Sequence, residues 1–153
     1  MCAQRARTAE GDAATAVVLE ILRVNGLLLT AGNRLAAHEG LTAARWQVLG
    51  AVALAGQPLT VPQIARRMGL TRQAVQESVN RLLAEVLVET RDNLDHRRSP
   101  LIGLTRLGSQ KYAALDRRQA RWINELSSGL KITDLAAATR ALRELGDRLE
   151  PNQ

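Results

Sequence analysis

The stretch GLTRQAVQESVNRLL, residues 69–83, decides the fold, because it predicts one helix with two very different faces. On a helical wheel, turned by about 100° per residue, its larger apolar side chains gather on one side. These side chains are Val75, Val79, Leu82 and Leu83. The other side carries Gln73, Gln76, Glu77, Asn80 and Arg81, with Arg72 near its edge in the first turn. The first face belongs in a core, whereas the second is dominated by hydrogen-bonding groups.

A short helix is predicted directly before this stretch, in LTVPQIARRMG at residues 59–69. Thr60 and Gln63 have the spacing of a capping box, and Pro62 stands in the first turn, where proline is tolerated. Gly69 suits the tight turn that follows. A short helix, a glycine turn and an amphipathic helix form a helix-turn-helix, whose second helix enters the major groove of DNA.

After the second helix the apolar period changes from that of a helix to that of a strand. VLVETR at 86–91 and SPLIGLT at 99–105 flank the charged segment DNLDHRR at 92–98, which predicts a two-stranded hairpin. A helix-turn-helix followed by such a hairpin is a winged helix. The hairpin tip, or wing, carries Arg97 and Arg98, and Arg91 precedes it. Arginine is favoured electrostatically in the minor groove and against phosphates.

The residue types on the polar face suit the reading of bases. Arginine can donate two hydrogen bonds to guanine, and glutamine or asparagine can pair with the edge of adenine. The alternative is a face that is merely solvated, but such a face usually carries Glu–Lys pairs rather than amides. We therefore predict DNA binding. The predicted contacts are Thr71, Arg72, Gln73, Gln76, Asn80 and Arg81 from the helix, and Arg97 and Arg98 from the wing.

Two acidic residues in this region need a separate interpretation, because phosphates repel carboxylates. We expect Asp95 to orient Arg97 or Arg98 through a charge-assisted hydrogen bond rather than to touch DNA. Glu77 either accepts a hydrogen bond from cytosine or neutralises Arg81 one turn further on.

Longer helices are predicted on both sides of the winged helix. Residues 13–39 and 132–149 carry apolar stripes, LTAARWQVLGAVALAG at 41–56 forms another helix, and Thr105 caps one that SSG breaks at 127–129. The two stripes can pack within one chain or form a dimer interface, and their length favours the dimer. The fold class is mainly α with a small β-hairpin wing. We divide the chain into a flexible tail (1–12), an N-terminal dimerisation helix (13–40), a winged helix-turn-helix (41–105) and C-terminal dimerisation helices (106–153).

Composition agrees with a small DNA-binding protein of the cytoplasm. The 153 residues carry a formal net charge of +6, which suits an anionic partner, and 46 % of them are hydrophobic. Cys2 is the only cysteine, which excludes an intrachain disulfide and fits a reducing compartment. The N-terminus does not read as a signal peptide, and Glu20, Arg23 and Asn25 interrupt the most apolar stretch before it reaches the length of a membrane span.

Taken together, LTAARWQVL at 41–49 and the segment from LTVPQIARRMG to LIGLT at 59–105 resemble the MarR family of bacterial transcriptional regulators. The resemblance includes the Asp-x-Arg wing at Asp95–Arg97. It implies a homodimer that binds a pseudo-palindromic operator, often as a repressor that a small ligand releases. The chain departs from the family's pattern at Val86, where glycine is usual, and at Leu94 and Arg106, where proline is common.

Other functions find little support in the sequence. His38 and His96 belong to no metal-binding or nucleophile motif, and no phosphate-binding loop is present, so we expect no enzyme, no metal and no cofactor. A redox sensor acting through Cys2 is one alternative. A constitutive DNA-binding protein, or a protein-interaction module without an effector, is another. Arg45, Trp46 and Tyr112 are candidates for a ligand pocket, but each also reads as a packing or solvated residue.

Overall fold

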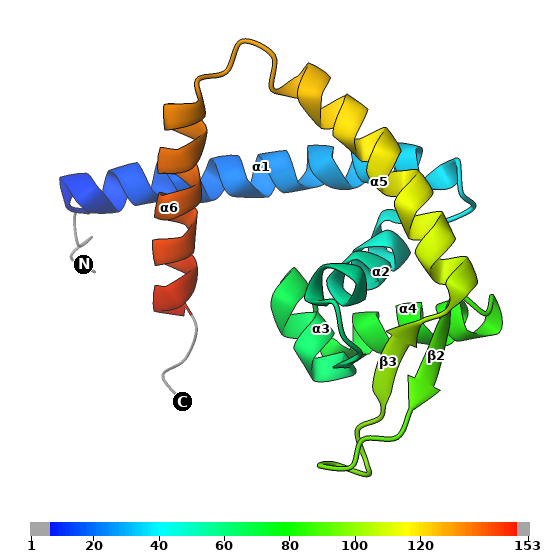
Figure 1. Ribbon diagram of the computed structural model, residues 1–153. Helices are drawn as coiled ribbons and strands as arrows, with labels where there is room; N and C mark the ends of the chain where they lie inside the picture. The colour runs from blue at the N-terminus through cyan, green and yellow to red at the C-terminus, as the bar shows by residue number, and fades with distance from the viewer. Residues whose placement is uncertain (1–6, 150–153) are drawn as a thin grey trace. The chain divides into compact units, whose positions relative to one another are not determined.

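The computed structural model describes residues 7–149, and it divides into two compact units, the first ending at Arg117 and the second beginning at Arg118. The helices are α1 (Ala9–Ala37), α2 (Ala43–Ala55), α3 (Val61–Met68), α4 (Arg72–Ala84), α5 (Arg106–Leu126) and α6 (Ile132–Leu149). The strands are β1 (Leu59–Thr60), β2 (Val88–Arg91) and β3 (Leu101–Leu104). The predicted helices and the β-hairpin wing are therefore confirmed (Figure 1).

The winged helix forms one core in the first unit. Figure 1 shows α2, α3 and α4 gathered beside the β2–β3 hairpin. The two faces of α4 separate as the sequence predicts, since Val75, Val79 and Leu82 are fully buried and join Ile64 of α3 in this core. The largest buried side chains are Leu49, Leu59, Ile64, Leu82, Leu87, Ile102 and Leu115. The absence of Phe from the chain leaves this core to aliphatic side chains.

The sheet has three antiparallel strands in the order β1-β3-β2, one more strand than the sequence predicts. Val88 pairs with Leu104 in the predicted hairpin, and Leu59 of β1 pairs with Ile102 on the other edge of β3. A two-residue strand is too short to show a period of its own, so it escapes sequence analysis. Its effect is to attach the start of α3 to the base of the wing.

The unit boundary falls inside α5 rather than at its start. Leu115 is fully buried in the core of the winged helix, and Tyr112 packs against that core. The first half of α5 therefore belongs to the first unit.

Helix α1 begins earlier than the sequence predicts. Thr8 is its N-cap and accepts a hydrogen bond of 3.1 Å from the amide of Gly11, and Glu10 and Asp12 lie in the first turn, where acidic residues favour a helix. Part of the predicted tail is therefore helical, and the rest of it, with Cys2, lies outside the described residues. Sequence analysis missed this start because the apolar stripe begins only at Val17.

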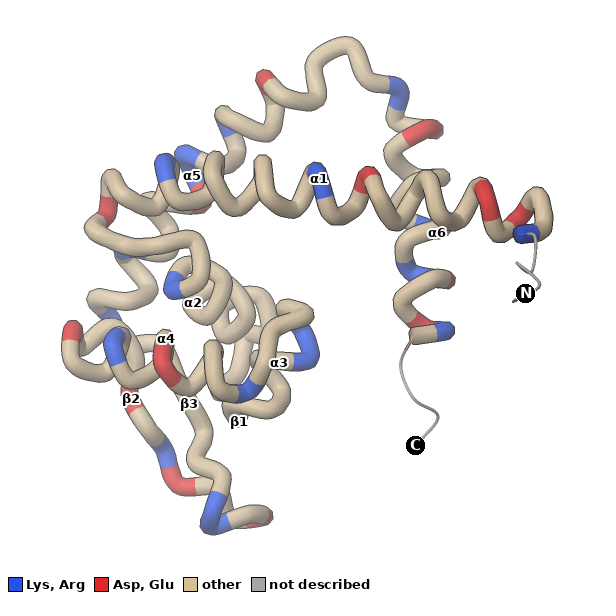
Figure 2. Tube along the Cα trace, turned by 180° about the vertical axis from the view of Figure 1, so that it is seen from behind, with Lys and Arg blue, Asp and Glu red and all other residues tan. Residues whose placement is uncertain are grey.

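The apolar side chains of α1 remain exposed in the single chain. Leu22 is 65 % exposed and Leu27 is 58 % exposed, and Figure 2 shows few charged positions along the middle of the helix. By length and composition alone, α1 is long and apolar enough to cross a membrane, which differs from the expectation that Glu20, Arg23 and Asn25 interrupt its apolar stretch too early. Monomeric soluble proteins rarely leave a large contiguous apolar surface exposed, and such surfaces commonly mark an interaction site.

The second unit contains the end of α5, a turn at Ser127–Gly129 and α6. None of the described residues of α6 is buried, although Leu135 and Leu142 are its stripe positions. This amphipathic helix, like α1, leaves apolar surface uncovered.

Candidate nucleic-acid interface

The geometry of α4 follows from the residues at its two ends. Gly69 adopts a left-handed conformation with φ 62° and ends α3, which allows the tight turn into α4. Thr71 is the N-cap of α4, and its hydroxyl accepts a hydrogen bond of 3.1 Å from the amide of Ala74. These two residues place Arg72 in the first exposed turn.

The exposed face of α4 carries two side-chain hydrogen bonds that connect successive turns. Gln76 Nε2 donates to Asn80 Oδ1 at 2.8 Å, and Gln73 Nε2 donates to Glu77 Oε1 at 3.3 Å. The first contact uses the amino group of Gln76 and the carbonyl of Asn80. The carbonyl of Gln76 and the amino group of Asn80 therefore stay available to a partner. One acceptor and one donor is the combination that pairs with the edge of adenine.

Glu77 pairs with a residue of its own helix other than Arg81, the second of the two partners considered for it. It accepts a hydrogen bond from Gln73, and no ion pair joins it to Arg81 among the described residues. Glu77 therefore does not neutralise Arg81 here. Arg81 lies exposed in the last turn of α4.

The wing loop is organised by Asn93, a residue that sequence analysis missed. Its Nδ2 donates to the carbonyl of Ser99 at 2.8 Å, and its Oδ1 accepts from the amides of Asp95 and His96 at 3.2 and 3.3 Å. Asparagine commonly closes turns in this way, and its place at the end of a strand is the signal that could have found it. Asn93 thus joins both arms of the loop.

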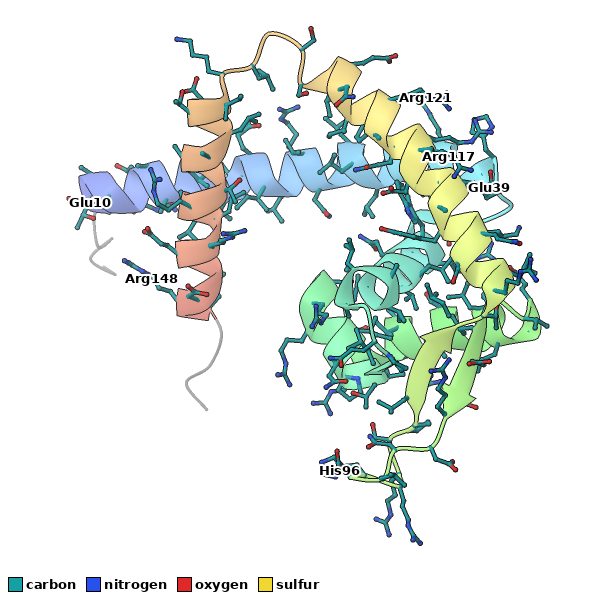
Figure 3. All side chains as sticks on the ribbon, viewed as in Figure 1. Glu10, Glu39, His96, Arg117, Arg121 and Arg148 are labelled. Atoms are coloured by element: carbon teal, nitrogen blue, oxygen red, sulfur yellow. The ribbon has the colours of Figure 1, made fainter. Side chains whose placement is uncertain are left out.

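The predicted pairing of Asp95 with an arginine is not seen among the described contacts. Asp95, Arg97 and Arg98 are all exposed, and Figure 3 places His96 at the tip of the wing. The loop therefore owes its order in this structure to Asn93, and an orienting role for Asp95 stays a prediction.

A groove of about 440 Å³ runs between α4 and the wing. Arg72, Gln73 and Gln76 line it from α4, while Arg98 lines it from the wing. Val79, Leu83 and Ile102 are among its apolar lining residues. The structure thus brings four of the predicted DNA contacts to one groove, whereas Thr71, Asn80, Arg81 and Arg97 lie outside its lining.

A second groove, of about 690 Å³, separates α3 from the wing loop. Gln63 and Arg66 line it from α3, and Asn93, Asp95 and His96 line it from the loop. Arg66 is exposed in the last turn of α3 and adds a cation that the sequence-based set omits. The Arg66–Arg67 pair directly before the turn is the signal that could have found it.

Within the described residues, no group of three or more His, Cys, Asp or Glu side chains could hold a metal ion. Figure 2 shows basic and acidic positions interspersed along α4 and the wing, and the basic ones are arginines. The exposed arginines and amides of this surface offer hydrogen bonding and attraction of anions.

A model of the MarR family matches residues 39–99, which contain α2, α3, α4 and the wing. An uncharacterized protein of Mycobacterium tuberculosis is 40 % identical over 134 residues, which cover 88 % of this chain and 92 % of that protein.

Solved structures share the fold at lower sequence identity. The Escherichia coli MarR mutant complexed with operator DNA is 21 % identical, with a TM-score of 0.73 over 85 % of this chain and 93 % of that one. CouR of Rhodococcus jostii, bound to p-coumaroyl-CoA, is 21 % identical, with a TM-score of 0.77 over 90 % of this chain and 94 % of that one. At these identities the likeness establishes the winged-helix fold.

Proposed function

Since the chain belongs to the MarR family, we propose that it acts as a dimeric, sequence-specific DNA-binding regulator of transcription, a repressor that a small ligand releases. Members of this family are transcription regulators rather than enzymes. The observation that carries the proposal is the groove between α4 and the wing, because it joins Arg72, Gln76 and Arg98 on one surface.

Direct reading of bases is assigned to α4. Arg72 suits a bidentate contact with guanine, and the Gln76–Asn80 pair suits adenine. Thr71, Gln73 and Arg81 lie on the same exposed helix and position it against phosphates. The E. coli MarR mutant, which has the same fold and is complexed with operator DNA, supports binding to an operator.

The wing supplies contacts that do not depend on sequence. Arg97 and Arg98 are exposed on a loop whose ends Asn93 holds together. Arginines on such a loop bind phosphates or enter the minor groove, where the negative potential is strong.

A homodimer accounts for the exposed apolar faces of α1 and α6. Val17, Ile21, Val24 and Leu28 of the predicted α1 stripe are 37–47 % exposed, and so are Leu135 and Leu142 of α6. Apolar surface of this extent is normally covered by a partner. A second copy of the chain would cover it and would also present a second α4 to a pseudo-palindromic operator. We place this dimer in the cytoplasm, where its DNA is.

Release by a small ligand has a parallel in a protein of the same fold. CouR, which shares the fold, was crystallised with p-coumaroyl-CoA. This supports a ligand-responsive regulator as opposed to a constitutive one.

The proposal is tested by selecting bound duplexes from a random library at two salt concentrations and by measuring the mass of the protein in solution. We expect an inverted repeat whose half-sites are centred about one helical turn apart, or a multiple of it, and a particle of twice 16.7 kDa. Recovery of no motif, with binding that disappears in salt, would favour the protein-interaction alternative. A monomer at micromolar concentration would contradict the dimer.

A further inference from the structure

Arg45, in the first turns of α2, holds together two segments that are far apart in the sequence. Its Nη2 donates to the carbonyl of Gly40 at 3.0 Å, and its Nη1 donates to the carboxylate of Glu85. The side chain of Arg45 is only 13 % exposed, whereas that of Glu85 is 44 % exposed. One guanidinium thus bridges Gly40 and Glu85, and its partner Glu85 lies forty positions further along the chain than Arg45 itself.

Both contacts are made at the ends of helices that matter for DNA binding. Gly40 lies in the turn that closes α1, and Glu85 is the C-cap of α4. The last carbonyls of a helix lack partners within it and carry partial negative charge, so a cation is favoured there. Lys111 of α5 adds a second cation, since its Nζ donates to the carbonyl of Glu39 at 2.6 Å.

The chemistry of Arg45 points to a geometric role rather than to stabilisation. A guanidinium is a planar fork, so two simultaneous contacts fix its direction as well as its position. Its Nε is buried without a hydrogen-bond partner, and an unsatisfied buried donor lowers stability. The pair with Glu85 adds little stability either, because the carboxylate of Glu85 is 44 % exposed and an exposed ion pair contributes at most about 1 kcal/mol.

We infer that Arg45 is a positioning residue, which fixes α4 relative to the end of α1. The consequence for DNA rests on the proposed function. If α1 helps to form the dimer, a fixed angle between α1 and α4 also fixes the separation of the two recognition helices. Arg45 then determines which half-site spacing the dimer accepts, although it touches no DNA.

The direct test measures the distance between α1 and α4 within one chain. Spin labels are placed on Arg34→Cys at the end of α1 and on Ala74→Cys in α4, in a Cys2→Ser background. Both labelled positions are exposed. Labelled protein is diluted with unlabelled protein, so that pulsed electron paramagnetic resonance reports distances within one chain. We expect Arg45→Met to broaden or shift a narrow distribution, and an unchanged distribution would overturn the inference.

Two further variants keep the test decisive if Arg45→Met does not fold. Arg45→Lys retains the charge but cannot bridge Gly40 and Glu85 with a fixed fork, and Glu85→Gln weakens one contact only. Both are expected to broaden the distribution. The matched control is Glu89→Gln, which removes an exposed ion pair to Arg91 (2.7 Å) that stays within β2. It should leave the distribution unchanged.

The second readout is the spacing preference of the selected operator. Adding one base pair between half-sites rotates them by about 35°, so the wild-type protein should lose affinity. The discrimination is the ratio of the affinity for the selected spacing to the affinity for the spacing longer by one base pair. We expect Arg45→Met and Arg45→Lys to reduce this ratio by at least about fivefold, which is the low end of the coupling between linked sites. A variant that keeps the wild-type discrimination would overturn the link to spacing. If the wild-type protein selects no inverted repeat, the proposed function fails, and the spin-label measurement still decides the role of Arg45.

Discussion

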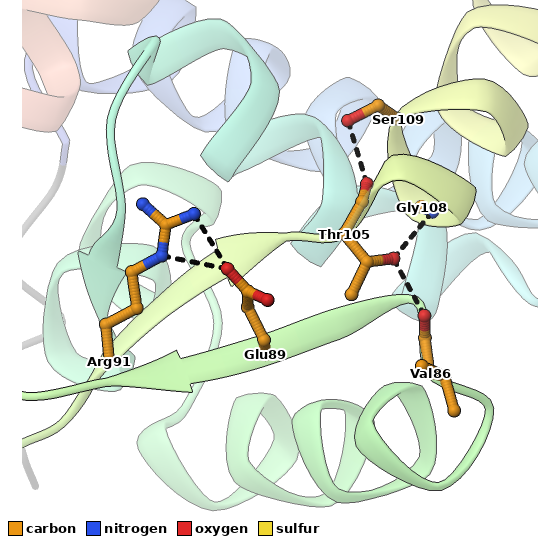
Figure 4. A network of polar contacts seen from close by, with 6 residues as sticks. All are labelled: Val86, Glu89, Arg91, Thr105, Gly108 and Ser109. Carbon is orange, nitrogen blue, oxygen red and sulfur yellow. Dashed lines mark hydrogen bonds and ion pairs between the residues drawn. The ribbon is translucent and has the colours of Figure 1, made fainter.

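The hydroxyl of Thr105 donates a hydrogen bond of 2.7 Å to the carbonyl of Val86, across the junction that joins the recognition helix to the wing (Figure 4). The same hydroxyl accepts a hydrogen bond of 3.0 Å from the amide of Gly108. The amide of Thr105 donates a hydrogen bond of 3.2 Å to the carbonyl of Leu87. Val86 has φ 58°, the only positive φ of a non-glycine residue between positions 7 and 149. A β-branched residue is thus held in a left-handed turn by the start of α5.

Val86→Gly is expected to stabilise the protein. Left-handed backbone costs an L-residue about 1–2 kcal/mol, whereas glycine adopts it freely. Glycine also makes the unfolded chain more flexible, which costs about 0.4–1 kcal/mol. The net gain should be about 0.5–1 kcal/mol in the free energy of unfolding, measured by urea denaturation.

The control for this change is Ala84→Gly, at the end of α4. Ala84 is exposed and helical, so glycine there should destabilise by about 0.5–1 kcal/mol. Equal effects of the two substitutions would show that Val86 is not strained.

Gly108→Ala is expected to destabilise the protein, by about 1–3 kcal/mol or more. A Cβ at Gly108 would lie 1.9 Å from the carbonyl oxygen of Leu87, a backbone atom that cannot turn aside. Gly146→Ala is the control, because a Cβ in that part of α6 would meet nothing within 4 Å. It should stabilise the helix slightly, and thermal unfolding of both variants measures the contrast.

The sequence was sufficient to predict the helix-turn-helix, because α3 and α4 carry local signals. The capping box at Thr60 and Gln63 is present, and the buried and exposed faces of α4 fall as periodicity requires. These features depend on neighbours within a few residues.

The parts that were missed depend on contacts between distant segments. The strand β1 exists only because Leu59 and Thr60 pair with β3, and Asn93 orders the wing through Ser99 on its opposite arm. The bond between Thr105 and Val86 spans nineteen residues. Single-sequence patterns report local preference, so the distant partners in these contacts cannot be read from them, even where a residue such as Asn93 carries a local turn signal.

Tyr112 should titrate above the usual range of a tyrosine. Burial, with a smaller contribution from the negative charge of Asp116, raises the pKa of its phenol above the ordinary value of 10.0. The folded state then holds the proton more tightly than the unfolded state, so stability should fall as the pH rises above about 10. Ultraviolet absorbance of phenolate measures the pKa cleanly, because the chain has one tyrosine.

Tyr112→Phe is the control for this pH dependence. It removes the ionisable group but keeps the ring beside Gly50 in the core. The part of the fall in stability at alkaline pH that is due to Tyr112 should therefore disappear. A phenol that titrates at or below its ordinary pKa would contradict the prediction.

Arg97→Ala should weaken binding to specific and random DNA alike. A phosphate contact releases counterions, so its loss should reduce the slope of log affinity against log salt by about one unit. Fluorescence anisotropy at several salt concentrations measures that slope. Arg143→Ala removes the same charge from α6, outside the winged helix, and should leave the slope nearly unchanged. An unchanged slope for Arg97→Ala would remove the wing tip from the DNA.

Arg72→Ala should act on base preference instead. Arg72 lies in the first exposed turn of α4 and lines the groove shared with the wing, where a guanidinium can meet a guanine edge. Loss of such a contact costs about 1–3 kcal/mol on the operator and less on random DNA. Arg72→Lys separates the two roles of the side chain, because lysine keeps the charge but not the bidentate fork. If Arg72 reads a base, Arg72→Lys should lose preference at one operator position while it keeps the salt slope of the wild-type protein. If Arg72→Lys instead retains the full preference, and Arg72→Ala weakens all duplexes equally, Arg72 contacts phosphate, and the reading of bases falls to Gln76 and Asn80.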